Sequence, residues 1–400
     1  MITEQIKREI ADGSLYAITL DTNVFDKNAL KLNAGLLKQI EQFKGTSVSF
    51  VLSEIVYREV LSHLKNNLSE SQSSLTASLN DVRKWWGIAG GYIDKVKSEI
   101  FECSPESVAQ SRLSDFRRRT DCQIILLDNQ PILSEITRRY FSGKPPFGDK
   151  SSKKHEFPDA LALLSLDAWA ETNATKIIAV SSDNDWKKYG AESGRLIVID
   201  DLSEALSFFQ EDSDILCEIL SLRIANKEFD SAYRIIIDAL RDQIYINDFV
   251  VEASASYSFE SDIDEVAVMK FKFDIENAFE NRYYLKPVHG SMETLVAEAS
   301  LIVSMSVYCF FSFYTSGNWG KGGKEPMGFA SLTTKIDFPM DVLITFIRSG
   351  EDYNITAVEV ISQTVNVDFG KVAPDWDEPE EPDFEPDWDE TPSDQGILTF

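Results

Sequence analysis

Short apolar segments alternate with longer helical patterns along the first half of the chain. The apolar segments are rich in Ile, Val and Leu, and each is followed by a stretch in which apolar residues recur every three or four positions. These segments lie at 15–20, 47–52, 175–180 and 195–200. Such alternation is typical of an α/β fold with a mainly parallel sheet. We therefore expect an α/β domain with a mainly parallel sheet over about residues 1–210.

A long helical region separates the second of these strands from the third. It covers about residues 68–142, and the residues at 104–106 (Ser-Pro-Glu) predict a new helix start within it. Two adjacent aromatic residues, Trp85 and Trp86, lie in this region. Paired aromatic side chains either stack on nucleobases or pack against a neighbouring helix. The sequence leaves both interpretations open.

The second half of the chain has a different pattern. Two amphipathic helices are expected between 212 and 246, and period-two alternation then predicts strands at 266–275, 295–315, 340–349 and 353–362. We expect a helical linker and an antiparallel, β-rich α+β domain over 211–371. No basic residue follows Lys371, and acids, prolines and aromatic residues are interleaved over 372–400. This composition predicts a disordered acidic tail.

Composition narrows the class of protein. A chain of 400 residues with 43% hydrophobic content can bury a full core and is long enough for two or three domains. The longest apolar run, 301–313, is too short to span a membrane. The first ten residues contain no apolar signal core, so we expect a cytoplasmic location. The four cysteines lack metal-ligand spacing, which favours free thiols over a zinc site or a disulfide framework.

The net charge of −27 is distributed unevenly. Residues 1–210 carry 26 basic and 29 acidic side chains, whereas the remainder carries 13 and 37. The first half is therefore nearly neutral and remains compatible with a nucleic-acid partner, although basic clusters are also common on solvated surfaces. The candidate phosphate contacts are Arg117, Arg118, Arg119, Arg138, Arg139, Lys150, Lys153 and Lys154.

Asp159 is unusual within the helix predicted in the stretch 153–171, where Pro158 fits the first turn and 160–170 is rich in helix formers. Counting in helical steps from it gives Ala162, Leu163, Leu166 and Ala170, so the carboxylate begins the apolar stripe that should face the core. An acid in the first turn is favoured by the helix dipole. That structural explanation and a functional one are both consistent with this stretch alone.

Other acids are expected at the same edge of the sheet. Asp21 follows the strand at 15–20, Asp183 and Asp185 follow the strand at 175–180, and Glu59 lies in the helix after 47–52. The carboxyl ends of parallel strands share one edge, where ligands bind. Any single Asp there could be a helix cap. Four acids within about 4 Å would repel by roughly 4 kcal/mol per pair, which a cation would offset. Oxygen ligands and a sequence with only three histidines favour Mg²⁺ or Mn²⁺.

Four short motifs in this order resemble those of the PIN-domain nucleases. They are LDTN at 20–23, SEIVYREV at 53–60, EFPDA at 156–160 and SSDNDW at 181–186. The stretch from 145 to 160 resembles a bacterial PIN-like branch in particular. The resemblance covers about residues 16–200. It implies a three-layer α/β/α fold with metal-dependent cleavage of single-stranded or structured RNA, less often of DNA.

The resemblance also implies roles for individual residues. Asp21, Glu59, Asp159 and Asp183 are then catalytic metal ligands, with Glu54 remaining an alternative to Glu59. Asp185 is a further ligand, and the accessory residues are Asn23, Glu156 and Ser181, which stands where the family usually has Thr. Two departures are the long helical region before Asp159 and the lack of any recognisable domain after about residue 212.

The sequence thus predicts a cytoplasmic endoribonuclease that uses Mg²⁺ or Mn²⁺ to activate a water molecule. A structure-specific or single-strand-specific DNase would use the same acids. A non-catalytic PIN-like scaffold is the alternative from a different class. The expected partner is RNA or DNA and not a membrane. A second copy of the chain or another protein would bind through the C-terminal β-rich domain or the acidic tail.

Overall fold

The chain forms two compact units, which are described separately. The computed structural model describes residues 2–127, 132–147, 156–210, 213–225, 232–274, 285–291, 293–315, 325–350 and 352–377. The first unit is built from residues 1–248, 268–305 and 337–365. The second is built from 249–267, 306–336 and the chain from 366 onward. The domain limits expected at 210 and 371 stay predictions, because compactness alone does not define a functional domain.

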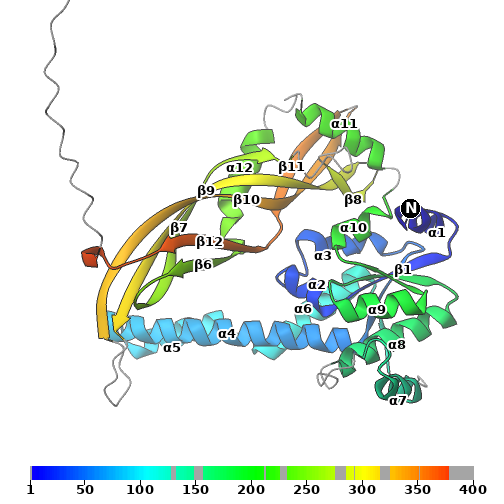
Figure 1. The fold of residues 1–400 in the computed structure, drawn as a ribbon, viewed down its shortest axis with the longest axis horizontal. Coiled ribbons are helices and arrows are strands. Elements are labelled where there is room, and N and C mark those ends of the chain that lie inside the picture. The colour runs from blue at the N-terminus through cyan, green and yellow to red at the C-terminus, as the bar shows by residue number, and fades with distance from the viewer. Residues whose placement is uncertain are drawn as a thin grey trace, which may run out of the picture. The chain divides into compact units, whose positions relative to one another are not determined.

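The first unit contains a parallel sheet flanked by helices (Figure 1). Its strand order is β3-β2-β1-β4-β5, and every neighbouring pair is parallel. The strands are β1 (Leu15–Leu20), β2 (Ser49–Ser53), β3 (Gln123–Ile125), β4 (Lys176–Val180) and β5 (Leu196–Ile199). This is the expected α/β architecture. All five strands therefore end at one edge of the sheet, which is where the candidate acids were placed from the sequence.

One expectation about this sheet was wrong. The region 68–142 is not entirely helical, because β3 lies inside it and pairs with β2. β3 is three residues long and is an edge strand, so it carries too few positions to show a period of two. The region instead consists of helices on either side of this strand.

The helices of the first unit begin and end with recognisable signals. α4 starts after Ser53, whose side chain accepts a hydrogen bond from Val56 N–H (3.2 Å), and ends at Gly87 in the left-handed region (φ 66°). The predicted helix start at Ser104 is confirmed as the cap of α6. The helices before α10 are α1 (Ile2–Ala11), α2 (Thr22–Lys27), α3 (Gly35–Gln39), α4 (Glu54–Trp86), α5 (Gly90–Ile100), α6 (Pro105–Thr120), α7 (Ile132–Ser142), α8 (Phe157–Thr172) and α9 (Asn184–Ser193).

The apolar stripe predicted for the helix around Asp159 is confirmed in α8. Ala162, Leu163, Leu166 and Ala170 are all buried there. They belong to one core that also contains residues of β1, β2 and β4. Burial of these side chains fixes the rotation of α8 and thereby the direction of its first turn.

Helices and a second sheet follow the parallel sheet. The helices are α10 (Leu202–Ser207), α11 (Asp214–Ala225) and α12 (Ala232–Gln243). The second sheet has the order β11-β10-β9-β7, with β8 paired to β9 and antiparallel pairing for β10–β11 and β8–β9, and β12 pairs with β6. The strands are β6 (Asp248–Ser254), β7 (Ser258–Phe273), β8 (Lys286–Gly290), β9 (Thr294–Thr315), β10 (Glu325–Ser349), β11 (Asp352–Val360) and β12 (Thr364–Lys371). The predicted strand-rich second half is thus confirmed.

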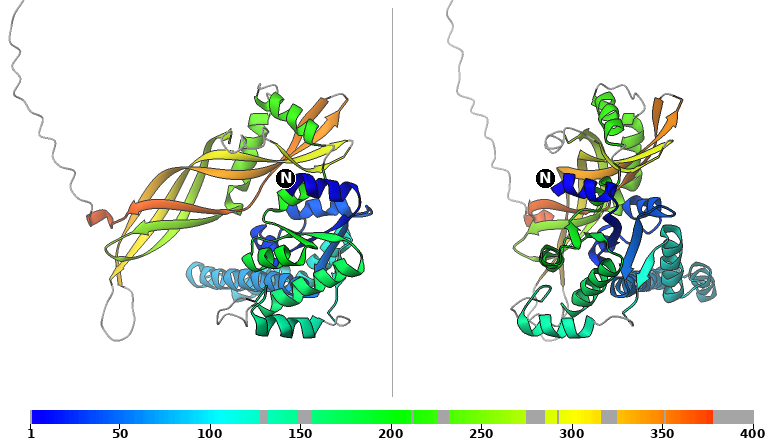
Figure 2. Two further views of the ribbon diagram at one scale, coloured as in Figure 1. Left: turned by 45° about the vertical axis from the view of Figure 1, so that its right-hand side comes forward. Right: turned by 90° about the vertical axis from the view of Figure 1, so that its right-hand side faces the viewer.

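Part of this second sheet is integral to the first unit. Val288, Val296 and Leu343, from β8, β9 and β10, belong to the same buried core as the parallel sheet. Lys286 on β8 pairs with Glu298 (3.2 Å) and with Asp201 (3.3 Å), the cap of α10. Apolar packing and charge pairing therefore both bind these strands to α10, the helix that follows β5. Figure 2 draws the ribbon from two further sides.

The second unit has its own small core. Phe311, Phe313 and Val372 are among its buried residues. The expected acidic tail starts inside this unit: Val372 N–H donates to Ser254 O (2.8 Å), and Trp376 Nε1–H donates to Met327 O (3.0 Å). Residues 372–377 are therefore folded rather than tail-like. The remainder, 378–400, lies outside the described residues.

Within the described ranges, no helix is long and apolar enough to cross a membrane. The cysteines are all free, and Cys103 is exposed whereas Cys122, Cys217 and Cys309 are buried. The absence of disulfides among them agrees with the sequence prediction.

Candidate active site

Asp21 lies at the carboxyl edge of the sheet, directly after β1. Its N–H donates to Val180 O at the end of β4 (3.0 Å), which joins the two central strand ends. Its backbone is extended (φ −80°, ψ 160°), and it caps the N-terminus of α2. Only 6% of its surface is exposed. The strand-to-helix transition thus holds a buried carboxylate at the centre of this edge.

Three donors hold the Asp21 side chain. Thr22 N–H donates to Oδ1 (2.6 Å), while Asn23 Nδ2 (2.7 Å) and Ser181 Oγ (2.6 Å) donate to Oδ2. Ser181 is completely buried, and its Oγ also accepts a hydrogen bond from Asp183 N–H (3.0 Å). The accessory positions expected at Asn23 and Ser181 are therefore in direct contact with Asp21.

Glu59 and Glu54 lie in different surroundings although both belong to α4. Glu59 Oε2 accepts a hydrogen bond from Thr22 Oγ1 (2.7 Å), next to Asp21. Glu54 accepts one from Leu127 N–H (3.1 Å) and pairs with Arg58. The structure thus brings Glu59 beside the other candidate acids and leaves Glu54 tied to the segment after β3.

Asp159 and Asp183 reach the same edge from α8 and α9. Asp159, in the first turn of α8, accepts a hydrogen bond from Trp186 Nε1–H (3.3 Å). Asp183 follows β4 and caps α9 by accepting from Asp185 N–H (2.6 Å). Asp159 is half-buried. The apolar stripe of α8 faces the core, whereas the Asp159 carboxylate lies beside the other acids, and this accounts for a charged residue at the start of the stripe.

The pKa values of two acids are raised by burial and by the nearby acids. Burial raises the pKa of Asp21 from 3.8 to about 7, with the charges of Asp159 and Asp183 acting in the same direction and the Ser181 hydrogen bond opposing them. Burial likewise raises the pKa of Asp159 to about 6; the Trp186 hydrogen bond opposes it, and the charges of Asp183, Glu59 and Asp185 add to it. The ends of β1 and β4 and the N-terminal parts of α4 and α8 therefore place mutually repelling carboxylates together.

The carboxylate oxygens of these acids are chemically suited to a hard cation. In this structure, however, they are not arranged as a complete set of metal ligands. The carboxylates are oxygen donors, and a divalent ion would offset the repulsion that raises the pKa of Asp21 and Asp159. However, over the described part of the chain, no group of three or more His, Cys, Asp or Glu side chains is arranged so that it could hold a metal ion. Both Asp21 oxygens instead accept hydrogen bonds from the protein.

The remaining predicted acids lie at the rim of this cluster. Asp185 pairs with Lys188 (2.8 Å), one turn further along α9. Glu156 occupies the N-cap position of α8, without a side-chain capping bond. The charges of Asp183 and Glu156 contribute to a raised pKa of Lys188, after its hydrogen bond and ion pair with Asp185. Lys188 is thus a cation beside the acids.

Sequence reasoning missed three residues of this site: Thr22, Trp186 and Lys188. Trp186 is fully buried and donates to Asp159. Thr22 and Trp186 both lie inside the quoted motifs, at 20–23 and 181–186, so their position was a usable signal. Their partners were not predictable, because Thr22–Glu59 and Trp186–Asp159 join residues far apart in the chain.

The first basic cluster lies at the other edge of the sheet. Arg117, Arg118 and Arg119 end α6, just before the start of β3, whereas the acids follow the ends of strands. Arg119 is committed to the fold: it pairs with Asp115 (2.8 Å) and Glu41 and donates to Leu32 O (2.8 Å). Arg119 is therefore corrected from a phosphate contact to a structural residue.

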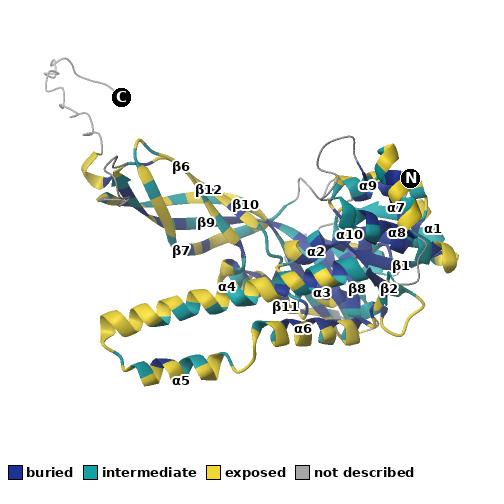
Figure 3. Cartoon of the chain, turned by 90° about the horizontal axis from the view of Figure 1, so that it is seen from below, coloured by how far each residue is buried: buried dark blue, intermediate teal, exposed yellow. Residues whose placement is uncertain are grey.

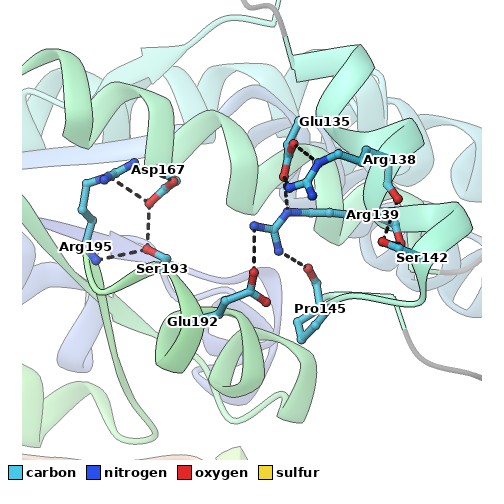
Figure 4. Close-up of polar contacts among 9 residues, drawn as sticks. All are labelled: Glu135, Arg138, Arg139, Ser142, Pro145, Asp167, Glu192, Ser193 and Arg195. Carbon is cyan, nitrogen blue, oxygen red and sulfur yellow. Dashed lines mark hydrogen bonds and ion pairs between the residues drawn. The ribbon is translucent and has the colours of Figure 1, made fainter.

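The second basic cluster, on α7, also makes polar contacts within the fold, and Figure 4 shows these contacts. Arg139 has 10% of its side chain exposed and pairs with Glu135 (2.7 Å) and Glu192 (3.2 Å). It also donates to Pro145 O (2.6 Å). These contacts leave no free face for a phosphate, so Arg139 is structural. Arg138, with 56% of its side chain exposed, stays a predicted contact.

The other predicted phosphate contacts are less constrained or not described. Arg117 donates to Cys122 O (3.3 Å), and Arg118 pairs with Asp115 on an exposed surface. Both stay predictions, although their edge of the sheet is remote from the acids. Lys150, Lys153 and Lys154 lie outside the described residues.

Comparison with known families agrees with this fold. The sheet order and the acids at its carboxyl edge define an α/β domain with a cluster of acids at the ends of its strands. Residues 18–186 match the family model of the PIN domain, so this part of the chain is a PIN domain. No curated protein and no solved structure matches the chain.

Proposed function

We propose that the protein is an endoribonuclease that depends on Mg²⁺ or Mn²⁺ and hydrolyses RNA phosphodiester bonds. The observation that carries the proposal is the convergence of Asp21, Glu59, Asp159 and Asp183 at one edge of a PIN-domain sheet. Collecting acids in this way destabilises the metal-free protein, so a purely structural role offers no explanation for it. A cytoplasmic location stays a prediction from the sequence.

The residues of the site have separate tasks in this proposal. Asp21, Glu59, Asp159 and Asp183 hold the cation, and Asp185 serves as a further ligand. When bound, the cation lowers the pKa of a water molecule and stabilises negative charge on the phosphate. Glu156 lies at the rim, where we expect it to act as an accessory residue.

Neighbouring side chains orient these acids. Thr22, Asn23 and Ser181 fix Asp21 by hydrogen bonds of 2.6–2.7 Å. Thr22 also holds Glu59, so that two acids share one positioning residue. Trp186 holds Asp159 in the same manner. The exposed Lys188 supplies a positive charge beside the acids, where a substrate phosphate would approach.

The test is a cleavage assay with the purified full chain. Labelled RNA and DNA of one sequence are incubated with Mg²⁺, with Mn²⁺ or with EDTA. We expect internal cleavage of RNA that requires the cation and leaves 5′-phosphate ends. The Asp21→Asn variant should be inactive. The Glu54→Gln variant is the matched control and should retain activity, because Glu54 is bonded to the segment after β3.

The alternatives give different results in the same assay. If the protein cleaves DNA but not RNA, the proposed function changes from an RNase to a DNase that uses the same acids. Binding of nucleic acid without cleavage under any cation would favour the non-catalytic scaffold. Activity that persists in Asp21→Asn would show that another site performs the reaction.

A further inference from the structure

α4 and α5 form a helical hairpin that projects from the parallel sheet of the first unit. α4 is 33 residues long, and only its first part carries buried side chains: Val56, Val60 and Leu64. The chain reverses at Gly87, whose left-handed conformation (φ 66°) ends α4. Figure 3 shows the outer part of α4 as mainly exposed. The hairpin is therefore an arm whose tip is formed by residues 81–97.

Among the described residues, the aromatic side chains of this tip are largely exposed. Trp85 is 75% exposed and Trp86 is 80% exposed, and Tyr92 beside the turn is 62% exposed. The buried residue of α5 is Ile93 (3% exposed). Over the described part of the chain, the tryptophan pair is therefore not packed against a neighbouring helix, and it forms an exposed aromatic surface that is suited to contact with a partner.

The charges of the tip indicate what that partner is. Between residues 81 and 97 the chain carries four basic side chains and two acidic ones, although the whole protein has a net charge of −27. The Lys84 ammonium lies 4.6 Å from the centre of the Trp85 ring. Exposed rings with adjacent cations suit the bases and phosphates of a single strand, because any base offers a face for stacking.

The arm also fixes how far this surface lies from the acids. Glu59 and Trp85 belong to the same helix, and the 1.5 Å rise per residue separates them by roughly 40 Å along its axis. A strand with a spacing of 3.4 Å per nucleotide needs roughly 12 nucleotides to cover that distance. Only a long substrate could contact both places at once.

From these observations we infer that the tip of the α4–α5 hairpin is a binding site for single-stranded nucleic acid, with Trp85 and Trp86 as the stacking surface and Lys84 as a phosphate contact. The inference rests on the proposed function for the identity of the strand, which is RNA. It adds a second contact remote from the acids and makes affinity depend on substrate length.

The test measures binding without cleavage. An unstructured, labelled RNA of about 30 nucleotides, long enough for the separation above, is titrated with the full-length protein in EDTA. The double variant Trp85→Ala/Trp86→Ala should bind at least about tenfold more weakly. Lys84→Glu should bind more weakly and with a smaller dependence on salt. Phe141→Ala is the matched control, because Phe141 is also 80% exposed but lies on α7.

A blunt RNA duplex of the same length separates stacking from general charge attraction. Its affinity should be unchanged in the tryptophan variant, since paired bases cannot stack on the rings. Equal losses for strand and duplex, or no loss for the strand, would overturn the inference. Loss of self-association or of a bound protein, with RNA affinity retained, would also overturn it and assign the tip to a protein partner.

The same experiment distinguishes this inference from the proposed function. Binding in EDTA does not require catalysis, so a protein that binds RNA through the tip but cleaves nothing leaves the inference intact and removes the nuclease. If the protein cleaves RNA and the tryptophan variant binds RNA as tightly as the wild type, the proposed nuclease function stands and the inference about the tip is overturned. Melting temperatures of all variants should match that of the wild type, because the replaced side chains are exposed.

Discussion

At the residue scale, the site depends on a carboxylate that is buried against its own electrostatic preference. Asp21 has a pKa of about 7, so at neutral pH much of its population carries a charge that burial disfavours. Its hydrogen bonds to Thr22, Asn23 and Ser181 compensate only in part. A residue kept under such conditions is a candidate for function rather than for stability.

Replacing Asp21 by Asn should therefore abolish cleavage without unfolding the metal-free protein. The free energy of unfolding is expected to stay the same or to rise, with an upper limit of about 4 kcal/mol for the raised pKa. Chemical denaturation in EDTA measures it. If the variant instead loses stability, capping of α2 is the main role of Asp21.

The pH dependence of the same comparison has a defined sign. Because the folded pKa of Asp21 is above the unfolded value of 3.8, the folded protein binds the proton more tightly. This stabilising contribution is complete below about pH 4 and is lost as the pH rises through about 7. The stability of Asp21→Asn relative to wild type should thus increase over that range. A difference independent of pH would contradict the raised pKa.

Metal linkage tests the other acids. A cation that binds only the folded protein at about 100 times its Kd adds roughly 2.7 kcal/mol to the free energy of unfolding. Asp159→Asn and Glu59→Gln should respond to Mn²⁺ much less than the wild type, whereas Glu54→Gln should respond fully. Equal melting shifts in Asp159→Asn and wild type would remove Asp159 from the site.

At the element scale, long patterned segments were predictable and short ones were not. The stripe of α8 was found because many positions repeat the same signal. The cap of α6 at Ser104 was found because Ser-Pro-Glu is a local helix-start sequence. β3 was missed because three residues carry no period. The basic clusters were misjudged in part for a related reason: the partners of Arg119 and Arg139 include Glu41 and Glu192, which only folding brings near.

The arginine pair of α7 offers a direct test of that correction. Arg139 is buried and pairs with Glu135 and Glu192, so Arg139→Ala should lower the free energy of unfolding by about 3 kcal/mol. Arg138 also pairs with Glu135 but is exposed, so Arg138→Ala should change it by less than about 0.5 kcal/mol. Urea denaturation of both variants measures the difference. Similar values for the two would mean that the Arg139 network contributes little.

At the scale of the whole molecule, the sequence indicated where alternating strands and helices give way to a strand-rich second half. It did not indicate which of these later strands join the core of the first unit. The strand-rich second half was recognised from its alternation. That β8, β9 and β10 contribute to the core of the first unit was not, because Val288, Val296 and Leu343 look like ordinary inward positions of any sheet. The pairing of Lys286 with Asp201 joins residues 85 apart, which no local pattern records.

The acidic chain end belongs to this scale, because we expect it to compete with substrate for the nucleic-acid-binding surfaces of the protein. Beyond Asp377 the sequence has nine acidic residues and no basic ones, with Phe384 and Trp388 among them. This combination resembles a nucleic-acid strand in charge and in stackable rings. The sequence predicts a disordered segment here, and a disordered tether would supply an effective concentration on the order of millimolar. Even weak contacts with nucleic-acid-binding surfaces would then compete with substrate.

Truncation after Asp377 should therefore raise cleavage at low ionic strength, and the gain should shrink as salt screens the interaction. The cut must follow Asp377 rather than Lys371, because Val372 is buried and Trp376 is bonded to Met327 in the second unit. A full-length variant with the acids after 377 replaced by Asn and Gln separates charge from chain length and should match the truncation. Rates are compared with the wild type at each salt concentration. Unchanged rates at low salt would leave the acidic chain end without an inhibitory role and favour its use as a surface for a protein partner.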